Sequence, residues 1–308
     1  MKTVLKLTVI GACALAASTT AALATSELPR GLTTGLSIGT PMPEGVYDIS
    51  IGSYGGWAPK TIVVDLQGHS ASLGQSAAYA IPAWIIWWTP WQIAGGRVVV
   101  DTATGLADLW DEGQKGRDSW LNTLVEAGIG WNLGGGLGVS FHAGAWLPST
   151  QLVPSLLGRD YTAFQGAAAI SYTANGWNLS ATGIYGSGGG GETISGYPFT
   201  AQQASWFNLD LTAAKHFGKF ETGIVAYGSW DMSDSGALTC ATTGGLAAAA
   251  PCKQHQFAVG SLAGYDFGTF IAQAKFTTDV EEENYRGKET RGTLTLITRL
   301  WKPEDSLK

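Results

Sequence analysis

This sequence lacks any long apolar run beyond its first residues. A helix needs about 20 consecutive apolar residues to cross a bilayer, and after residue 24 no uninterrupted run approaches that length. Charged residues are also scarce, at 14% of the 308 residues, against about 25% in average soluble domains. A membrane protein with this composition would have to cross the bilayer with strands.

Basic clusters and paired metal ligands are missing as well. The 18 lysines and arginines are scattered among 24 acidic residues, and the net charge is -6. This distribution excludes the basic footprint that a nucleic acid requires. The four histidines show no paired ligand spacing, and only two of the three cysteines lie beyond residue 24. We therefore predict no metal site and no cofactor.

The first 24 residues have the form of a secretory signal. Lys2 and Lys6 precede an apolar stretch that ends in Ala22-Leu23-Ala24, a small-residue cleavage site. We predict that residues 1–24 are a cleaved signal peptide. The predicted units after it are a periplasmic N-terminal arm at 25–43, a barrel at 44–302 and a short C-terminal tail at 303–308.

Large apolar residues alternate with small polar ones in the segment GWNLSATGIYGSGGGG, residues 176–191. In a strand, Trp177, Leu179 and Tyr185 would point to one face, while Asn178 and Thr182 would point to the other. A soluble sandwich and a membrane barrel both accept such a strand. The arrangement of the strands along the chain must separate the two folds.

About twelve strands of this kind follow one another, joined by connections that alternate between short and long. The predicted short connections are Thr89-Pro90, residues 134–136, Asn175-Gly176, Gly218-Lys219 and Gly268-Thr269. The predicted long ones are residues 57–78, 102–118, 148–160, 187–204, 231–253 and 280–288. Short periplasmic turns and long extracellular loops are typical of outer-membrane barrels. We predict an all-β fold, a transmembrane antiparallel β-barrel of about 12 strands.

Aromatic residues flank most of the short connections and the end of the last strand. Rings at one level around a barrel form a girdle in the lipid headgroup layer. The alternative, aromatic corners of a soluble sandwich core, does not account for their position at the short turns. The predicted girdle consists of Trp88, Trp91, Trp131, Trp177, Phe217, Phe220, Phe267, Phe270 and Trp301.

The alternation also assigns side chains to the barrel lumen. The predicted lumen-lining residues are Asp48, Glu126, His142, Gln165, Asp210, His216, Glu221, Tyr227, Lys275, Arg291 and Arg299. Both signs of charge occur among them, and a dry core would penalise each unpaired ion by several kcal/mol. A hydrated or hydrogen-bonded lumen removes that difficulty. The hairpin register around Gly218-Lys219 places His216 opposite Glu221.

The two cysteines that remain after processing enclose the segment GGLAAAAP in one predicted extracellular loop. Export through an oxidising periplasm favours a disulfide between Cys240 and Cys252. Two free thiols are the alternative. In the chain-entropy model, closing a loop of this size stabilises it by about 3 kcal/mol.

Four short motifs resemble a known family. They are PMPEGVYDISIGSYGGW at the first strand, GLADLW after the third, AWLPST after the fifth and RGTLTLITRLW at the end. In this order they are similar to the outer-membrane family named for the meta-pathway of phenol degradation. The resemblance implies uptake or export of aromatic or other apolar substrates, and it brings no catalytic residues.

We predict a non-enzymatic outer-membrane channel or transporter for small molecules, with a narrow polar lumen. The resemblance favours an apolar or aromatic solute, and the expected partners are this solute and outer-membrane lipid around a monomer. An outer-membrane enzyme similar to the lipid hydrolases and a structural or adhesion barrel remain alternatives. Residues 35–39, Gly-Leu-Ser-Ile-Gly, match the nucleophile-elbow pattern, but they lie before the first strand with no helix to follow. The direction of transport stays open, as does a calcium ion at Glu281, Glu282 and Glu283. Whether the lumen is open or plugged by a loop or by the N-terminal arm also stays open.

Overall fold

The structure is a computed structural model. It describes residues 28–58, 61–64, 70–73, 75–111, 117–148, 162–187, 192–193, 200–201, 205–232, 253–283 and 287–303. The predicted signal peptide, the predicted Cys240–Cys252 disulfide and most of the predicted C-terminal tail lie outside these residues.

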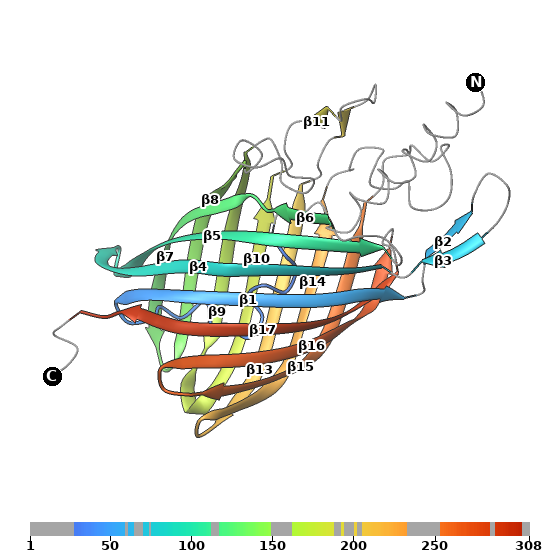
Figure 1. The fold of residues 1–308 in the computed structure, drawn as a ribbon. Helices are drawn as coiled ribbons and strands as arrows, with labels where there is room; N and C mark the ends of the chain where they lie inside the picture. The colour runs from blue at the N-terminus through green and yellow to red at the C-terminus, as the bar shows by residue number, and fades with distance from the viewer. Residues whose placement is uncertain are drawn as a thin grey trace.

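Twelve long strands form a closed antiparallel barrel (Figure 1). Each strand pairs with the next one along the chain, and the last strand pairs with the first. The predicted fold class is therefore confirmed. The strands are β1 (Gly45–Ala58), β4 (Gln75–Ile93), β5 (Gly96–Asp111), β7 (Thr123–Gly134), β8 (Leu137–Leu147), β9 (Ala163–Tyr172), β10 (Trp177–Gly186), β13 (Trp206–Phe217), β14 (Phe220–Asp231), β15 (His255–Asp266), β16 (Phe270–Glu283) and β17 (Lys288–Trp301).

Short elements lie in the connections between these strands. They are β2 (Thr61–Val64), β3 (Ser70–Leu73), β6 (Arg117–Trp120), the helical turn η1 (Ala174–Gly176), β11 (Glu192–Thr193) and β12 (Thr200–Ala201). β2 pairs with β3, β11 pairs with β12, and β6 extends the sheet along β5. Within the described part of the chain, no helix is long and apolar enough to cross a membrane.

The first short connection lies further along the chain than predicted. The chain passes through Thr89-Pro90 inside β4, where the pairing with β5 shifts register between Trp88 and Gln92. It turns instead at Ala94-Gly95, with φ of 50° and 77°. Proline has no N–H to donate, so it is tolerated where the ladder is interrupted. The four other predicted short connections lie between consecutive barrel strands.

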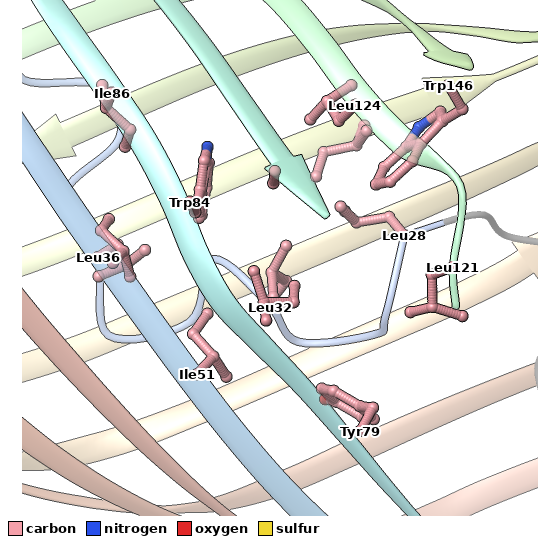
Figure 2. Close-up of a cluster of buried hydrophobic side chains, with 14 of the residues drawn as sticks. Leu28, Leu32, Leu36, Ile51, Tyr79, Trp84, Ile86, Leu121, Leu124 and Trp146 are labelled. Atoms are coloured by element: carbon pink, nitrogen blue, oxygen red, sulfur yellow. The ribbon is translucent and has the colours of Figure 1, made fainter. Parts of the chain in front are cut away.

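The N-terminal arm, residues 28–43, lies inside the barrel, where its blue trace runs within the ring of strands (Figure 1). From the sequence this segment is a periplasmic arm, and whether it plugs the lumen stays open. Leu28, Leu32 and Leu36 recur every four residues and are 4%, 2% and 5% exposed. They belong to one buried cluster with Ile51 and Trp84 (Figure 2). Burial of these leucines against apolar side chains stabilises the arm inside the barrel.

The inner face of the barrel divides into two walls, in which each residue named is at most 7% exposed. The apolar wall comes from β1, β4, β5 and β7 and consists of Ile49, Ile51, Ile81, Trp84, Ile86, Trp88, Val99 and Leu124. Two buried carboxylates, Asp101 and Glu126, lie on the same strands. The polar wall comes from strands between β9 and β17 and consists of Gln165, Asn178, Thr182, Asn208, Asp210, Thr212, Glu221, Gln273, Lys275, Asp279, Glu289 and Arg291.

Two predicted positions on the strands of the apolar wall are wrong. Asp48, predicted in the lumen, is half-buried on the outer face, because Tyr47 and Ile49 are the residues of β1 that point inward. Its Oδ2 accepts a hydrogen bond from the Ser50 hydroxyl at 2.8 Å. Trp88, predicted in the outer girdle, is 3% exposed and points inward. Polarity failed as a guide here because this part of the interior is itself apolar.

The outer face is apolar across the strands. Phe141, Phe164 and Ile224 are 58%, 63% and 66% exposed. Seven predicted girdle residues are exposed, and Trp131 is half-buried. The seven are Trp91, Trp177, Phe217, Phe220, Phe267, Phe270 and Trp301. Such a surface suits a hydrocarbon environment, and the position of the girdle in the headgroup layer stays a prediction.

Candidate functional site in the barrel interior

Charged side chains of the polar wall hold the middle of the arm. The backbone N–H and the hydroxyl of Thr33 both donate to Oδ2 of Asp210, at 2.8 and 2.7 Å. The ammonium of Lys275 donates to the Thr34 carbonyl at 2.8 Å. Hydrogen bonds to charged groups are stronger than neutral ones, so this contact fixes the arm to β13 and β16.

The peptide groups of Gly35 are saturated by the same wall. Its N–H donates to Thr212 Oγ1 at 2.7 Å, and its carbonyl accepts from the amides of Asn178 and Gln273, both at 3.0 Å. The φ of Gly35 is +84°, and an added Cβ would lie 2.6 Å from Gln273 Oε1. Glycine is required here for both reasons. The glycine of the nucleophile-elbow pattern therefore serves close packing.

Two arginines, Arg30 of the arm and Arg291 of β17, both pair with Glu289. Arg30 Nη2 lies 3.5 Å from Glu289 Oε2, and Glu289 also pairs with Arg291. The predicted lumen residue Arg291 is 4% exposed, donates to Ser53 Oγ at 2.8 Å and stacks over the Tyr79 ring at 4.7 Å. It is thus a member of a buried ion network.

The remaining predicted lumen arginine has a different environment. Arg299 is exposed, and its Nη2 donates to the Glu44 carbonyl at 2.6 Å. Its guanidinium lies 5.5 Å from the centre of the Tyr47 ring. Arg299 therefore belongs to the end of β17 where the chain enters β1, and it shares no described contact with Arg291.

A cavity of about 220 Å³ lies between the arm and both walls. Ile86, Trp88 and Ile184 give it apolar sides, and the arm contributes Leu36 and Ile38. Its polar lining includes Asp101, Glu126, His142, Gln165, His216, Glu221 and Gln273. An apolar cavity with a few convergent polar groups is the usual form of a small-molecule site.

A polar network crosses five neighbouring strands beside this cavity. The indole N–H of Trp84 donates to Asp101 Oδ1 at 2.8 Å, and the Gln165 amide donates to Glu126 Oε2 at 2.7 Å. The indole N–H of Trp146 donates to Gln165 Oε1 at 2.7 Å. Sequence reasoning missed Asp101 and Trp84. The available signal was a single carboxylate that follows the run Val98-Val99-Val100, at the inward parity of Val99.

Ser140, His142 and Glu126 have the order of a hydrolytic triad, with contacts of 3.0 Å from Ser140 Oγ to Nε2 and 3.3 Å from Nδ1 to Glu126 Oε1. Ser140 is nevertheless 0% exposed, and its hydroxyl donates to the Ile38 carbonyl at 2.9 Å. A nucleophile needs a free path to a substrate. This serine has none, so the arrangement gives no catalytic site.

The other lumen pair follows the predicted register. His216 pairs with Glu221 across the β13–β14 hairpin, and His216 Nε2 lies 3.3 Å from Glu221 Oε1. Gln273 donates to the other carboxylate oxygen of Glu221 at 2.8 Å. Tyr227 is 3% exposed and packs against Gly31, where a Cβ would lie 2.5 Å from its ring.

The structure thus places most of the predicted lumen residues inside the barrel. Those buried there are Glu126, His142, Gln165, Asp210, Glu221, Tyr227, Lys275 and Arg291. His216 has a side chain that is 39% exposed and lines the cavity. That these residues line a solute path stays a prediction.

A protein-family model matches residues 63–295 of the chain. The description of that family is "Putative MetA-pathway of phenol degradation". None of the curated proteins matches the chain.

Several solved structures are similar to this chain at low sequence identity. An outer-membrane channel from Pseudomonas putida F1 is 12% identical, with a TM-score of 0.65 over 84% of this chain and 97% of that one. The TodX monoaromatic hydrocarbon channel, in a mutant form, is 11% identical, with a TM-score of 0.42 over 84% and 92%. The translocator domain of the autotransporter NalP from Neisseria meningitidis is 11% identical, with a TM-score of 0.41 over 84% and 89%. The first of these shows the outer-membrane barrel fold.

Proposed function

The chain belongs to the family described by the phenol-degradation model, and we propose that it is a bacterial outer-membrane channel for small apolar or aromatic solutes. The solute passes through the barrel interior without chemical change. The mature protein starts after residue 24 and acts as a monomer in lipid. The similar structure from Pseudomonas putida is that of an outer-membrane channel, which supports this proposal, as does the name of the family.

The observation that carries the proposal is the cavity between the arm and the walls. Its volume is about 220 Å³, and a cavity of about 150 Å³ lined by Leu, Ile and Phe is enough for benzene. The indoles of Trp84 and Trp88 lie on one side, and Gln165 and His142 lie on the polar side. One aromatic ring with a polar group fits this combination of volume and lining.

The arm directs the proposed path toward the apolar wall. On the polar wall it is held by charged hydrogen bonds to Asp210 and Lys275. Against the apolar wall its leucines pack in the buried cluster, where apolar contacts are non-directional, and the arm carbonyls there accept hydrogen bonds from the neutral hydroxyls of Tyr47 and Tyr79. An apolar solute can replace such contacts with its own, whereas it cannot replace the charged hydrogen bonds. The path therefore follows the leucine side of the arm.

Filling the cavity tests the proposal. Ile184 lines the cavity and is 3% exposed, so Ile184→Trp should occupy the space of the solute. The readout is uptake of labelled phenol, toluene and benzoate by cells that express the protein in an outer membrane that otherwise limits their entry. We expect uptake of at least one solute to fall about tenfold, which is about 1.4 kcal/mol.

The matched control is Ile224→Trp, because Ile224 is 66% exposed on the outer face of β14. It should fold and transport like the wild type, with folding followed by heat-modifiable gel mobility. Wild-type barrels that fold normally but give no solute-dependent uptake and no conductance in a planar bilayer would overturn the proposal. A structural or adhesion role would then be favoured.

A further inference from the structure

Three ligand-type side chains meet in the wall of the cavity. Asp101 on β5 is the direct partner of Glu126 on β7, and His142 on β8 pairs with Gly128, two residues further along β7. One ligand atom from each of the three side chains lies within 4.8 Å of the other two. Asp101 and Glu126 are 3% and 6% exposed, and the His142 side chain is 8% exposed.

The surrounding hydrogen bonds fix which nitrogen of His142 carries a proton. The hydroxyl of Ser140 has one hydrogen, and it donates that hydrogen to the Ile38 carbonyl at 2.9 Å. Ser140 Oγ can then only accept from His142 Nε2, 3.0 Å away. A neutral His142 therefore presents the lone pair of Nδ1 to the cluster.

That lone pair is left without a donor. Nδ1 has no hydrogen-bond partner among the described residues, although Glu126 Oε1 lies only 3.3 Å away. Two acceptors that face each other at this distance repel unless a positive charge lies between them. The geometry thus calls for a positive charge at this point, which either a proton on Nδ1 or a bound cation would supply.

The two carboxylates have the same requirement. Within the described part of the chain, neither Asp101 nor Glu126 has a salt bridge to a lysine or arginine. Neutral donors occupy one oxygen of each, Oδ1 of Asp101 and Oε2 of Glu126. Buried charges in proteins are paired or coordinate metals.

We propose that Asp101, Glu126 and His142 form a binding site for a divalent cation of the Zn²⁺ class. Imidazole with two carboxylates is a ligand set that zinc accepts, and three protein ligands leave one coordination position open. Trp84 and Gln165 act as the outer partners that orient the carboxylates, as such sites require. This assignment goes beyond the solute path and does not depend on it, and it revises the expectation of no metal that the histidine spacing gave.

The test is Zn²⁺ titration of the full, folded barrel in detergent, prepared without a histidine tag and stripped with a chelator. Isothermal calorimetry should give one Zn²⁺ per barrel, and Co²⁺ should give the absorption bands of a low-symmetry site. Asp101→Asn keeps the size of the side chain and an acceptor for Trp84, so it should fold. We expect it and His142→Ala each to weaken Zn²⁺ binding by at least about 100-fold, and Trp84→Phe by about 10- to 100-fold.

His255→Ala is the control. His255 lies 3.4 Å from both Glu281 and Glu283, where β15 begins and β16 ends, and its removal should leave the affinity unchanged. A wild-type barrel that binds no Zn²⁺, or binding that survives in Asp101→Asn, would overturn the assignment and leave a proton on His142 as the neutralising charge. Binding that disappears in His255→Ala would overturn it in favour of that half-buried histidine. The solute proposal is tested by uptake and stands or falls separately.

Discussion

The two walls of the barrel interior are built by different rules, although they belong to one continuous sheet. The polar wall satisfies charged groups with hydrogen bonds, as Asp210 does with Thr33 and Lys275 with Thr34. The apolar wall excludes water by packing leucines of the arm against residues such as Ile51 and Trp84. An inward-facing residue of this barrel can therefore be polar or apolar. Which of the two it is depends on the part of the arm that it contacts.

The strongest way to break this comparison is to place the same charge on the two sides of the arm. Leu32 packs in the apolar cluster, whereas Thr34 lies 3.2 Å from the Lys275 ammonium through its hydroxyl. Leu32→Asp buries an unpaired carboxylate and should cost several kcal/mol. Thr34→Asp places its carboxylate beside the Lys275 ammonium, so it should cost less than Leu32→Asp, because a paired buried charge is penalised less than an unpaired one.

Urea unfolding in detergent measures both changes, and limited proteolysis reports release of the arm. The Leu32 variant should lose the arm to protease, while the Thr34 variant should protect it. Equal sensitivity of the two variants would show that the two walls do not differ as described.

The outer face provides a second comparison, between depths in the membrane. Leu211→Arg, near the middle of β13, should lower the stability of the folded barrel by about 2 to 4 kcal/mol, because a charged side chain is unfavourable at the bilayer midplane. Phe217→Arg lies on the same face at the end of β13, beside the short turn, and is 62% exposed. It should cost about 0 to 1 kcal/mol. Folding into lipid vesicles, followed by gel mobility, measures the difference, and equal costs would argue against a membrane-embedded face.

Removing the Asp210 carboxylate measures how much the polar wall stabilises the bound arm. Asp210→Ala deletes the acceptor of both Thr33 donors and should cost about 2 to 3 kcal/mol, the usual value for hydrogen bonds to a charged group. Asp210→Asn keeps one acceptor oxygen and should lose less. The free energies of unfolding of the two variants give the comparison. If Asn and Ala proved equivalent, the carboxylate would not be the anchor.

The smallest expected effect distinguishes the steric cost of a Cβ from the backbone cost of a positive φ at two glycines. Gly35 and Gly95 both have positive φ, but a Cβ at Gly35 meets Gln273 and Leu262, whereas nothing lies within 4 Å of one at Gly95. Alanine costs about 1 to 2 kcal/mol for the backbone at either site. Gly35→Ala should exceed Gly95→Ala by a further 1 to 3 kcal/mol, roughly, from overpacking. Thermal unfolding of the two variants measures this difference, which would vanish if the arm lay loosely in the barrel.

Sequence reasoning succeeded where alternation was unambiguous. On β10, β13 and β14 the buried positions follow the predicted parity, and His216 lies opposite Glu221 as predicted. These strands carry polar residues inward and apolar ones outward, so periodicity and polarity agree. The number of strands follows from the same alternation.

The same reasoning failed where a distant segment supplies the environment. Asp48 and Trp88 were assigned to the wrong faces because β1 and β4 turn apolar residues toward the arm. In the arm, Leu28, Leu32 and Leu36 recur every four residues, but this spacing does not reveal that their apolar partners lie inside the barrel. Asp101, Glu126 and His142 meet only through the register of three strands, and spacing along the chain carries no trace of that.

The seam between β1 and β17 joins residues as far apart in the sequence as Val46 and Trp301. Closing so long a chain segment costs conformational entropy, although the cost grows only slowly with length. The arm precedes β1 and already contacts Lys275 on β16 and Glu289 on β17. Because these contacts bring the chain before β1 beside the last strands, we expect the arm to favour closure of the seam as the barrel folds.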